Sequence, residues 1–349
     1  MTFTSRSPRL SAGCALLLAA AFTAHAAPAY VAHEVLGPDG LQGLVPQAMN
    51  GAGTVCGQTT MSSPAESFIL KAGGGYTTYE AIGPDFSVAM ALNDHGDTAG
   101  YGFTDHDSEA YVKPHGKDPI VLFKPGFGNT NSYAFGMNLG GTVVGRYDTP
   151  DNVTHAFSWT KGQVTTLPGL GGKWTWATAV NNAGVAVGIT HLPRTQGSHA
   201  VKWENGVMTD LGGLGYTNYY GDVPYDINDA GTAVGYCSIV AATSIPCVWH
   251  DGQVDTLPTL VDGLWAIAYA INNHDTVVGR AAYYDGVQHA EHAVIWKKGA
   301  ISDLNDLVAL PPGFTLNWAI DINDKGQVLA YGYDGNLARY FVLAPVATQ

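Results

Sequence analysis

Four side chains in this sequence could carry acid–base chemistry: His106, His191, Tyr219 and Asp222. Histidine changes its charge near neutral pH, and tyrosine or a carboxylate can also exchange a proton with a bound substrate. If these groups converge, they would suit a lyase or hydrolase that acts on a polysaccharide. The sequence contains no G-x-S-x-G elbow, H-E-x-x-H pair or phosphate-binding loop. Whether the four groups meet therefore depends on how the chain folds around them.

Aromatic residues in the connecting segments form a second group that could do chemistry. Large rigid rings of this kind anchor ligands when binding removes them from water. We expect a carbohydrate or a protein partner to contact this group, which comprises Trp174, Tyr216, Tyr219, Tyr220, Trp265, Tyr283 and Tyr284. Trp176 and Trp318 are candidates too, but both match positions where a strand begins, so a place in the core is equally open.

Three cysteines follow the N-terminal segment, and two of them could form a disulfide. Cys237 and Cys247 flank a variable connection between two expected strands. Counting antiparallel partners from Gly235 opposite Trp249 places the two cysteines opposite each other, at a separation that suits a disulfide. Cys56 stands where four related segments have valine, so we expect it to be buried and unpaired.

These residues are distributed over a segment that occurs seven times. Each copy contains a phrase such as AVNNAGVAVG or DINDAGTAVG. The copies are centred on Asn50, Asn93, Asn138, Asn181, Asn228, Asn272 and Asn323. Their spacings are 43, 45, 43, 47, 44 and 51 residues. A fixed period in the forties is typical of a propeller or another repeat array.

One copy contains the pattern of four short antiparallel strands. WATAV and VAVG alternate or are β-branched, and NNAG between them has the residues of a tight hairpin turn. HAVKW and VMTDL are separated by the second turn, ENG. Four such strands make one blade, so the sequence predicts an all-β, seven-bladed β-propeller that forms a single domain over residues 27–349.

The seventh copy supplies only three strands, whereas the segment 27–40 precedes the first copy and contains HEVLG, which resembles a fourth strand. We therefore expect residues 28–37 to complete the last blade and close the ring. Closure would remove the unpaired edges that a linear array exposes.

The phrases HAFSW, HAVKW and HAVIW, combined with NNAGVAVG and TDLGGLG, resemble the bacterial extracellular HAF repeat family. The resemblance covers nearly the whole chain after residue 26 and implies secretion, but it implies no reaction and no catalytic residue. The histidines of the phrase are His155, His199 and His292. They fall in different blades, so we expect local structural roles and no metal site. The tryptophans of the phrase, Trp159, Trp203, Trp249 and Trp296, are expected between blades.

Residues 1–26 have the pattern of a secretory signal peptide: Arg6 and Arg9, an apolar run, and a small-residue cleavage pattern ending at Ala26. We expect export to the periplasm or beyond and no membrane span. Cleavage would change the net charge from −13 to −15, because 16 basic residues become 14 against 29 acidic ones. Such a surface disfavours nucleic acid. We expect a monomer without a cofactor.

In a propeller the connections alternate between two faces. We expect the long second-to-third and fourth-to-first connections on one face and to carry function there, since variable loops on a rigid scaffold usually do. The tight asparagine turns would lie on the other face and offer little but backbone and small side chains. The sequence thus favours a secreted binding or scaffold module, with a polysaccharide-active enzyme or a purely structural surface repeat as alternatives.

Overall fold

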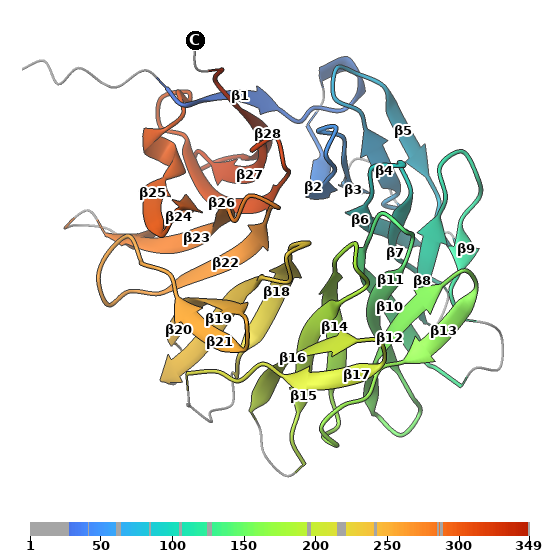
Figure 1. The fold of residues 1–349 in the computed structure, drawn as a ribbon. Coiled ribbons are helices and arrows are strands. Elements are labelled where there is room, and N and C mark those ends of the chain that lie inside the picture. The colour runs from blue at the N-terminus through green and yellow to red at the C-terminus, as the bar shows by residue number, and fades with distance from the viewer. Residues whose placement is uncertain are drawn as a thin grey trace, which may run out of the picture.

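The computed structural model of the chain consists of seven four-stranded antiparallel sheets arranged in a ring, a seven-bladed β-propeller (Figure 1). The structure describes residues 28–347 except 41, 61–63, 84, 105–106, 124–127, 194–196, 215–220, 241–242, 285 and 287–288. The sequence prediction of the fold is confirmed. No helix among the described residues is long and apolar enough to cross a membrane.

The strands follow the order expected from the repeat. Blade 1 contains β2 (Leu44–Met49), β3 (Val55–Thr59), β4 (Ser67–Leu70) and β5 (Tyr76–Tyr79), and blade 2 contains β6 (Phe86–Leu92), β7 (Thr98–Phe103), β8 (Ser108–Lys113) and β9 (Ile120–Val121). Blade 3 contains β10 (Asn131–Met137), β11 (Val143–Asp148), β12 (Thr154–Thr160) and β13 (Gln163–Thr166), and blade 4 contains β14 (Thr175–Val180), β15 (Ala186–His191), β16 (Ser198–Glu204) and β17 (Val207–Asp210).

Blade 5 contains β18 (Val223–Ile227), β19 (Ala233–Val240), β20 (Thr243–His250) and β21 (Gln253–Thr256), and blade 6 contains β22 (Ala266–Ile271), β23 (Val277–Tyr284), β24 (His289–Lys297) and β25 (Ala300–Asp303). Blade 7 contains β26 (Thr315–Ile322), β27 (Val328–Tyr333), β28 (Ala338–Pro345) and β1 (Tyr30–Glu34). Two short 3-10 helices, η1 (Pro38–Gly40) and η2 (Leu304–Asp306), are the helical elements of the described residues. The first strand of each copy is innermost, and these strands contact one another around the ring.

The N-terminal strand β1 completes blade 7, as the sequence predicts. It pairs antiparallel with β28, from Tyr30 opposite Pro345 to Glu34 opposite Phe341. Figure 1 shows the blue β1 beside the red β28, so the two ends of the described chain meet in one blade. Tyr30 is buried in the core of this blade.

A bulge in the inner strand explains the glycine that ends the repeated phrase. In blade 4 a Cβ on Gly188 would lie 2.1 Å from the carbonyl oxygen of Trp176, too close for any other residue. In blade 7 the same position is Ala330, and there the pairing of β26 with β27 shifts twice, whereas the other inner pairs shift once.

The core lies between blades. Trp159, Trp203, Trp249 and Trp296 are buried, as expected. Three of their indole N–H groups donate to backbone carbonyls of the preceding connection: Trp203 to Pro168, Trp249 to Gly212 and Trp296 to Pro258. The repeated tryptophan therefore holds the fourth-to-first connection as well as filling space.

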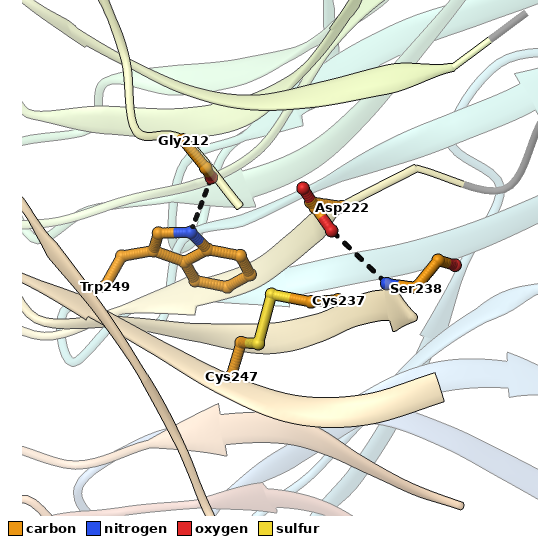
Figure 2. Close-up of a disulfide and its surroundings, with 6 residues drawn as sticks. All are labelled: Gly212, Asp222, Cys237, Ser238, Cys247 and Trp249. Atoms are coloured by element: carbon orange, nitrogen blue, oxygen red, sulfur yellow. Dashed lines mark hydrogen bonds between the residues drawn. A yellow bond between two sulfur atoms is a disulfide. The ribbon is translucent and has the colours of Figure 1, made fainter. Parts of the chain in front are cut away.

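The structure contains a disulfide between Cys237 and Cys247, with a Cα–Cα distance of 5.8 Å (Figure 2). The register used to predict it is wrong. Ala233, not Gly235, lies opposite Trp249, so Cys237 faces Ile245 and the two cysteines are diagonal neighbours on adjacent strands. Diagonal neighbours on one face of a sheet are still within reach of each other.

The remaining cysteine, Cys56, is free and fully buried. Burial raises the pKa of its thiol far above the ordinary range. The thiol is therefore an inert part of the core.

Candidate functional site

The repeated asparagines form a closed hydrogen-bonded ring at the end of the propeller that carries the first-to-second turns, here called the turn face. In each turn the Asn side-chain oxygen accepts a backbone N–H four residues later, as from Val185 to Asn181. The side-chain amide donates to the backbone carbonyl of the next asparagine, as from Asn181 to Asn228 at 3.0 Å. The other six bonds join Asn50 to Asn93, Asn93 to Asn138, Asn138 to Asn181, Asn228 to Asn272, Asn272 to Asn323 and Asn323 to Asn50.

The repeated asparagines have the turn role that the sequence predicts and a second role, the joining of neighbouring blades. Each amide sits at an interface between blades, and all seven side chains are buried. The sequence does contain a signal for the second role. An aspartate would serve equally well as a turn acceptor but cannot donate, and every copy has asparagine at this position.

A second layer of polar side chains lies one residue beyond the ring. Asp94, Asp229 and Asp324 accept backbone N–H groups from the preceding blade. The side-chain amide of Asn273 donates to both Asp229 and Asp324, and that of Asn182 donates to Asp229. Together with the asparagine ring they line a shallow funnel of about 230 Å³. The expectation that this face offers little but backbone and small side chains is therefore wrong. Because most of these groups bond to one another, the layer serves mainly to join blades.

Two carboxyl groups cross-link inner strands between blades. Asp226 accepts the backbone N–H of Ile271 in blade 6, and Asp321 accepts that of Met49 in blade 1. Burial raises the pKa of Asp226 to about 7, with a further contribution from the negative charge of Asp321. Burial likewise raises the pKa of Asp321 to about 6. Both therefore hold a proton more tightly in the folded chain than in the unfolded one.

This difference predicts a dependence of stability on pH. A raised carboxyl pKa adds stability that is fully present below the unfolded pKa near 3.8 and is lost as the pH rises through the folded value near 7. The wild type should therefore lose unfolding free energy between pH 5 and pH 8. In Asp226→Ala we expect this loss to be smaller by on the order of 2 kcal/mol. Alanine fits here because Ala179 and Ala270 hold the same position in the neighbouring blades.

Urea unfolding at the two pH values measures the effect. Asp118→Ala is the matched control, since Asp118 is exposed in the turn between β8 and β9 and its removal should leave the pH dependence unchanged. Equal pH dependence in the wild type and Asp226→Ala would contradict the raised pKa.

The opposite end of the propeller, here called the loop face, carries a pocket of about 360 Å³. It lies where the connections before β14 and after β15 meet. The pocket is lined by Arg146, Trp174, Trp176, Ile189, His191, Ser198, Val223 and Tyr236, from blades 3, 4 and 5. Of these, Trp174 is 44% exposed, an unusual exposure for so large a ring. This loop-face pocket is the candidate functional site.

One wall of the loop-face pocket combines a cation with aromatic rings. The Arg146 guanidinium lies 4.6 Å from the ring centre of Tyr133 in its own blade and 5.9 Å from that of Trp176 in the next blade. Trp174 meets the His191 imidazole edge-on at 5.1 Å. Burial, with the nearby His199, lowers the pKa of His191, so this imidazole is neutral at pH 7. Arg146 is then the one lining side chain with a full charge.

Asp222 lies directly behind the pocket, before Val223. Its carboxylate accepts the backbone N–H of Ser238 (Figure 2), and its own N–H donates to the Ser198 carbonyl. Burial raises the pKa of this carboxyl group to about 6. Thus two of the four residues singled out for acid–base chemistry, His191 and Asp222, do lie in the same region. The other two, His106 and Tyr219, lie outside the described residues.

The structure does not gather all of the predicted aromatic residues. Trp265 is partly buried against the Arg280 guanidinium, 5.3 Å from it. Tyr283 stacks on His292 at 4.0 Å, and the exposed Tyr284 stacks on His289 at 4.6 Å. These three lie in blade 6, away from the loop-face pocket. Tyr216, Tyr219 and Tyr220 lie outside the described residues.

The histidines of the repeated phrase have local partners. His199 bonds Asp210 at 3.0 Å and His292 bonds Asp303 at 2.5 Å, in each case from the third to the fourth strand of one blade. His155 stacks on Tyr147. In the part of the chain that the structure describes, no three metal-ligating side chains are grouped to hold an ion.

A larger groove of about 1,020 Å³ extends over blades 4, 5 and 6 on the turn face. Its lining is acidic, with Glu204, Asp210, Asp229, Asp251 and Asp275 against two lysines, and its tryptophan, Trp249, is buried. The smaller loop-face pocket is the better candidate, because it combines the exposed ring of Trp174 with a cation, and its described lining residues include no acidic side chain.

Comparison with known proteins shows the fold. No family model matches the chain, and no curated protein matches it in sequence. The β-propeller domain of the trilobed protease from Pyrococcus furiosus, described as having an open velcro topology, is 12% identical with a TM-score of 0.60, over 93% of this chain and 96% of that one. Virginiamycin B lyase from Staphylococcus aureus, solved with quinupristin, is 10% identical with a TM-score of 0.56, over 91% and 100%.

Oligogalacturonate lyase from Vibrio parahaemolyticus is 9% identical with a TM-score of 0.54, over 90% of this chain and 91% of that one. At such low identity these likenesses establish the β-propeller fold and nothing about the ligand. The function of this chain therefore has to be argued from its own side chains.

Proposed function

We propose that this protein is an exported carbohydrate-binding β-propeller whose ligand occupies the loop-face pocket. The observation that carries the proposal is the convergence of Trp174, Trp176 and Tyr236 from two blades on one concavity. Flat apolar rings next to a few fixed polar groups are the usual composition of a small-molecule site. His191 and Arg146 supply the polar groups here. Export, which the pattern of residues 1–26 predicts, would bring this pocket to the polysaccharides of a cell surface.

The test begins with a glycan array, followed by calorimetric titration of the sugar that binds best. We expect the double substitution Trp174→Ala, Trp176→Ala to weaken binding by about 1 to 3 kcal/mol, because aromatic anchors carry much of the binding energy where they lose water. Trp318→Ala is the matched control: this ring is 39% exposed on the same face but lies outside the pocket.

Full-strength binding by the double variant would contradict this placement of the site. So would loss of binding on Asn182→Ala, a change on the turn face. Melting temperatures of all variants show whether each is folded.

A second candidate function is cleavage of the bound sugar. It is favoured by Asp222, whose raised pKa of about 6 suits proton exchange near neutral pH. It is also favoured by His191, because Ser198 lies opposite His191 and its carbonyl accepts the N–H of Asp222. The sugars that bind should then be incubated with wild-type protein and with Asp222→Asn. New reducing ends or unsaturated products, lost in the variant, would identify an enzyme, and intact sugar would leave a binding module.

A further inference from the structure

We propose that the loop-face pocket recognises a carboxylate-bearing sugar, a uronic acid, with Arg146 and the indole N–H of Trp176 holding the carboxylate. The inference rests on the proposed carbohydrate-binding function and adds the class of sugar. Its basis is a comparison between two interfaces of the same propeller, in which one interface has a carboxylate that bonds both donors and the other has none bonded to them.

The reference interface lies between blades 6 and 7. Arg280 stands eight residues after Asn272, and its guanidinium lies 4.5 Å from the ring centre of Trp318. The Glu291 carboxylate connects them: one oxygen accepts from Arg280 Nη1 at 3.0 Å and from Trp318 Nε1 at 2.7 Å. A single carboxylate thus satisfies a guanidinium and an indole N–H together.

The interface between blades 3 and 4 repeats the same donors. Arg146 stands eight residues after Asn138, as Arg280 does after Asn272, and Trp176 stands five residues before its own repeat asparagine, as Trp318 does. The strand pairing makes the correspondence firm. Arg280 lies opposite Ala293 and Arg146 lies opposite Ala156, and the two alanines are in the third strands of their blades.

The acceptor differs. Glu291 lies opposite Ala282, and the matching residue in blade 3, opposite Asp148, is Thr154. The Thr154 hydroxyl donates to the Asp148 carboxylate at 2.7 Å and faces neither donor. Across the described residues, Arg146 has no ion pair and the Trp176 indole N–H has no acceptor, whereas a buried Nε without a hydrogen-bond partner is common to Arg146 and Arg280.

A ligand carboxylate would restore the arrangement seen at Glu291. A planar guanidinium matches the geometry of a carboxylate, and the bond is charge-assisted. Arg146 is the charged side chain of the lining, since His191 is neutral at pH 7. The remaining walls, Trp174 and Tyr236, are broad rings that suit the face of a pyranose better than the thin, flexible side chain of an acidic peptide.

The experiment compares acidic and neutral sugars of equal size. Oligomers of glucuronate, galacturonate and mannuronate, and the matching oligomers of glucose, galactose and mannose, are titrated calorimetrically into wild-type protein and Arg146→Gln. We expect at least one uronate to bind tenfold or more tightly than its neutral partner. Arg146→Gln should abolish this preference, so that the uronate and its neutral partner bind the variant with equal affinity.

Two further variants sharpen the test. Arg280→Gln alters the arginine that already has Glu291 and should not change uronate binding. Thr154→Glu places a carboxylate at the position in blade 3 that matches Glu291 in blade 6. This carboxylate should bind Arg146 in place of the ligand and so weaken uronate binding at least tenfold. Melting temperatures identify variants that fail to fold, and Arg146→Gln remains decisive if the buried Thr154 site does not accept glutamate.

The possible failures are distinct. Equal affinity for acidic and neutral sugars, unaffected by Arg146→Gln, would overturn the uronate inference and leave sugar binding intact. Absence of binding by every sugar would overturn both proposals. Binding of a poly-glutamate peptide in place of the sugars, lost in Arg146→Gln, would retain the carboxylate contact but overturn the assignment to a saccharide.

Discussion

Deletion of residues 28–37 should lower the free energy of unfolding by at least about 5 kcal/mol. The deletion removes the five paired residues of β1, the contacts of the buried Tyr30, and the backbone bonds from Ala29 and Tyr30 to the Leu307 carbonyl. Each net hydrogen bond contributes about 1 kcal/mol, and burying a large apolar side chain about 2 to 3 kcal/mol. The edge of β28 would also be exposed, and unpaired edges promote association.

Urea unfolding and light scattering measure the two effects. Tyr30→Ala should account for about 3 kcal/mol of the loss, because it leaves a cavity beside Leu304 and Val308. Val31→Ala is the control within the same strand, since Val31 is 49% exposed and should cost less than about 0.5 kcal/mol. A deletion variant as stable as the wild type would show that β1 does not hold blade 7 together.

Asn181→Ala should lower the free energy of unfolding by about 2 to 4 kcal/mol. The substitution leaves the part-buried N–H of Val185 without its acceptor and removes the buried bond between blades to the Asn228 carbonyl, which then accepts only from the N–H of Gly231. An unsatisfied buried group costs about 1 to 3 kcal/mol. Asn181→Asp separates the two roles, because it keeps the turn acceptor but replaces the donor to blade 5 with a buried negative charge.

We expect Asn181→Asp to be at least as destabilising as alanine at pH 7. Asn182→Ala, one residue along and more exposed, should cost less than about 1 kcal/mol. Chemical denaturation gives all three values. Wild-type stability of Asn181→Asp would mean that the amide serves only its own turn.

The sequence predicts those features that one copy of the repeat already contains. Alternating strands, the N-x-x-G turn and the valine-rich second strand depend on local residue preferences, and these sufficed for the blade, the ring and the closing role of residues 28–37. The one exception to the turn glycine, Asp275, also adopts a positive φ of 55° and bonds the amide of Asn228. Local residue preferences were enough to predict these features because the strands of a blade follow one another closely in the sequence.

Features that depend on two blades were harder to predict. The contact of Arg146 with Trp176 and the raised pKa of Asp226 depend on how residues thirty or more positions apart are placed by two neighbouring blades. A bulge moves the pairing of strands by one position, and the error in placing Gly235 opposite Trp249 shows how a small miscount changes every partner. Trp174 is exposed, as its place in a loop predicts, and its role in binding stays a prediction. Trp176, at the start of β14, needed the structure.

The asparagine ring also has a consequence for the order of folding. Six of its seven bonds join residues 43 to 51 positions apart, whereas the bond from Asn323 to Asn50 spans 273. Closing so long a loop directly would cost about 1.5 kcal/mol more in chain entropy than closing one of the shorter loops. Once six neighbouring pairs have docked, however, the first and last blades already face each other. We therefore expect the propeller to assemble as an open arc that becomes a circle only at its final step, and the junction of blades 7 and 1 to be the place where that circle first opens.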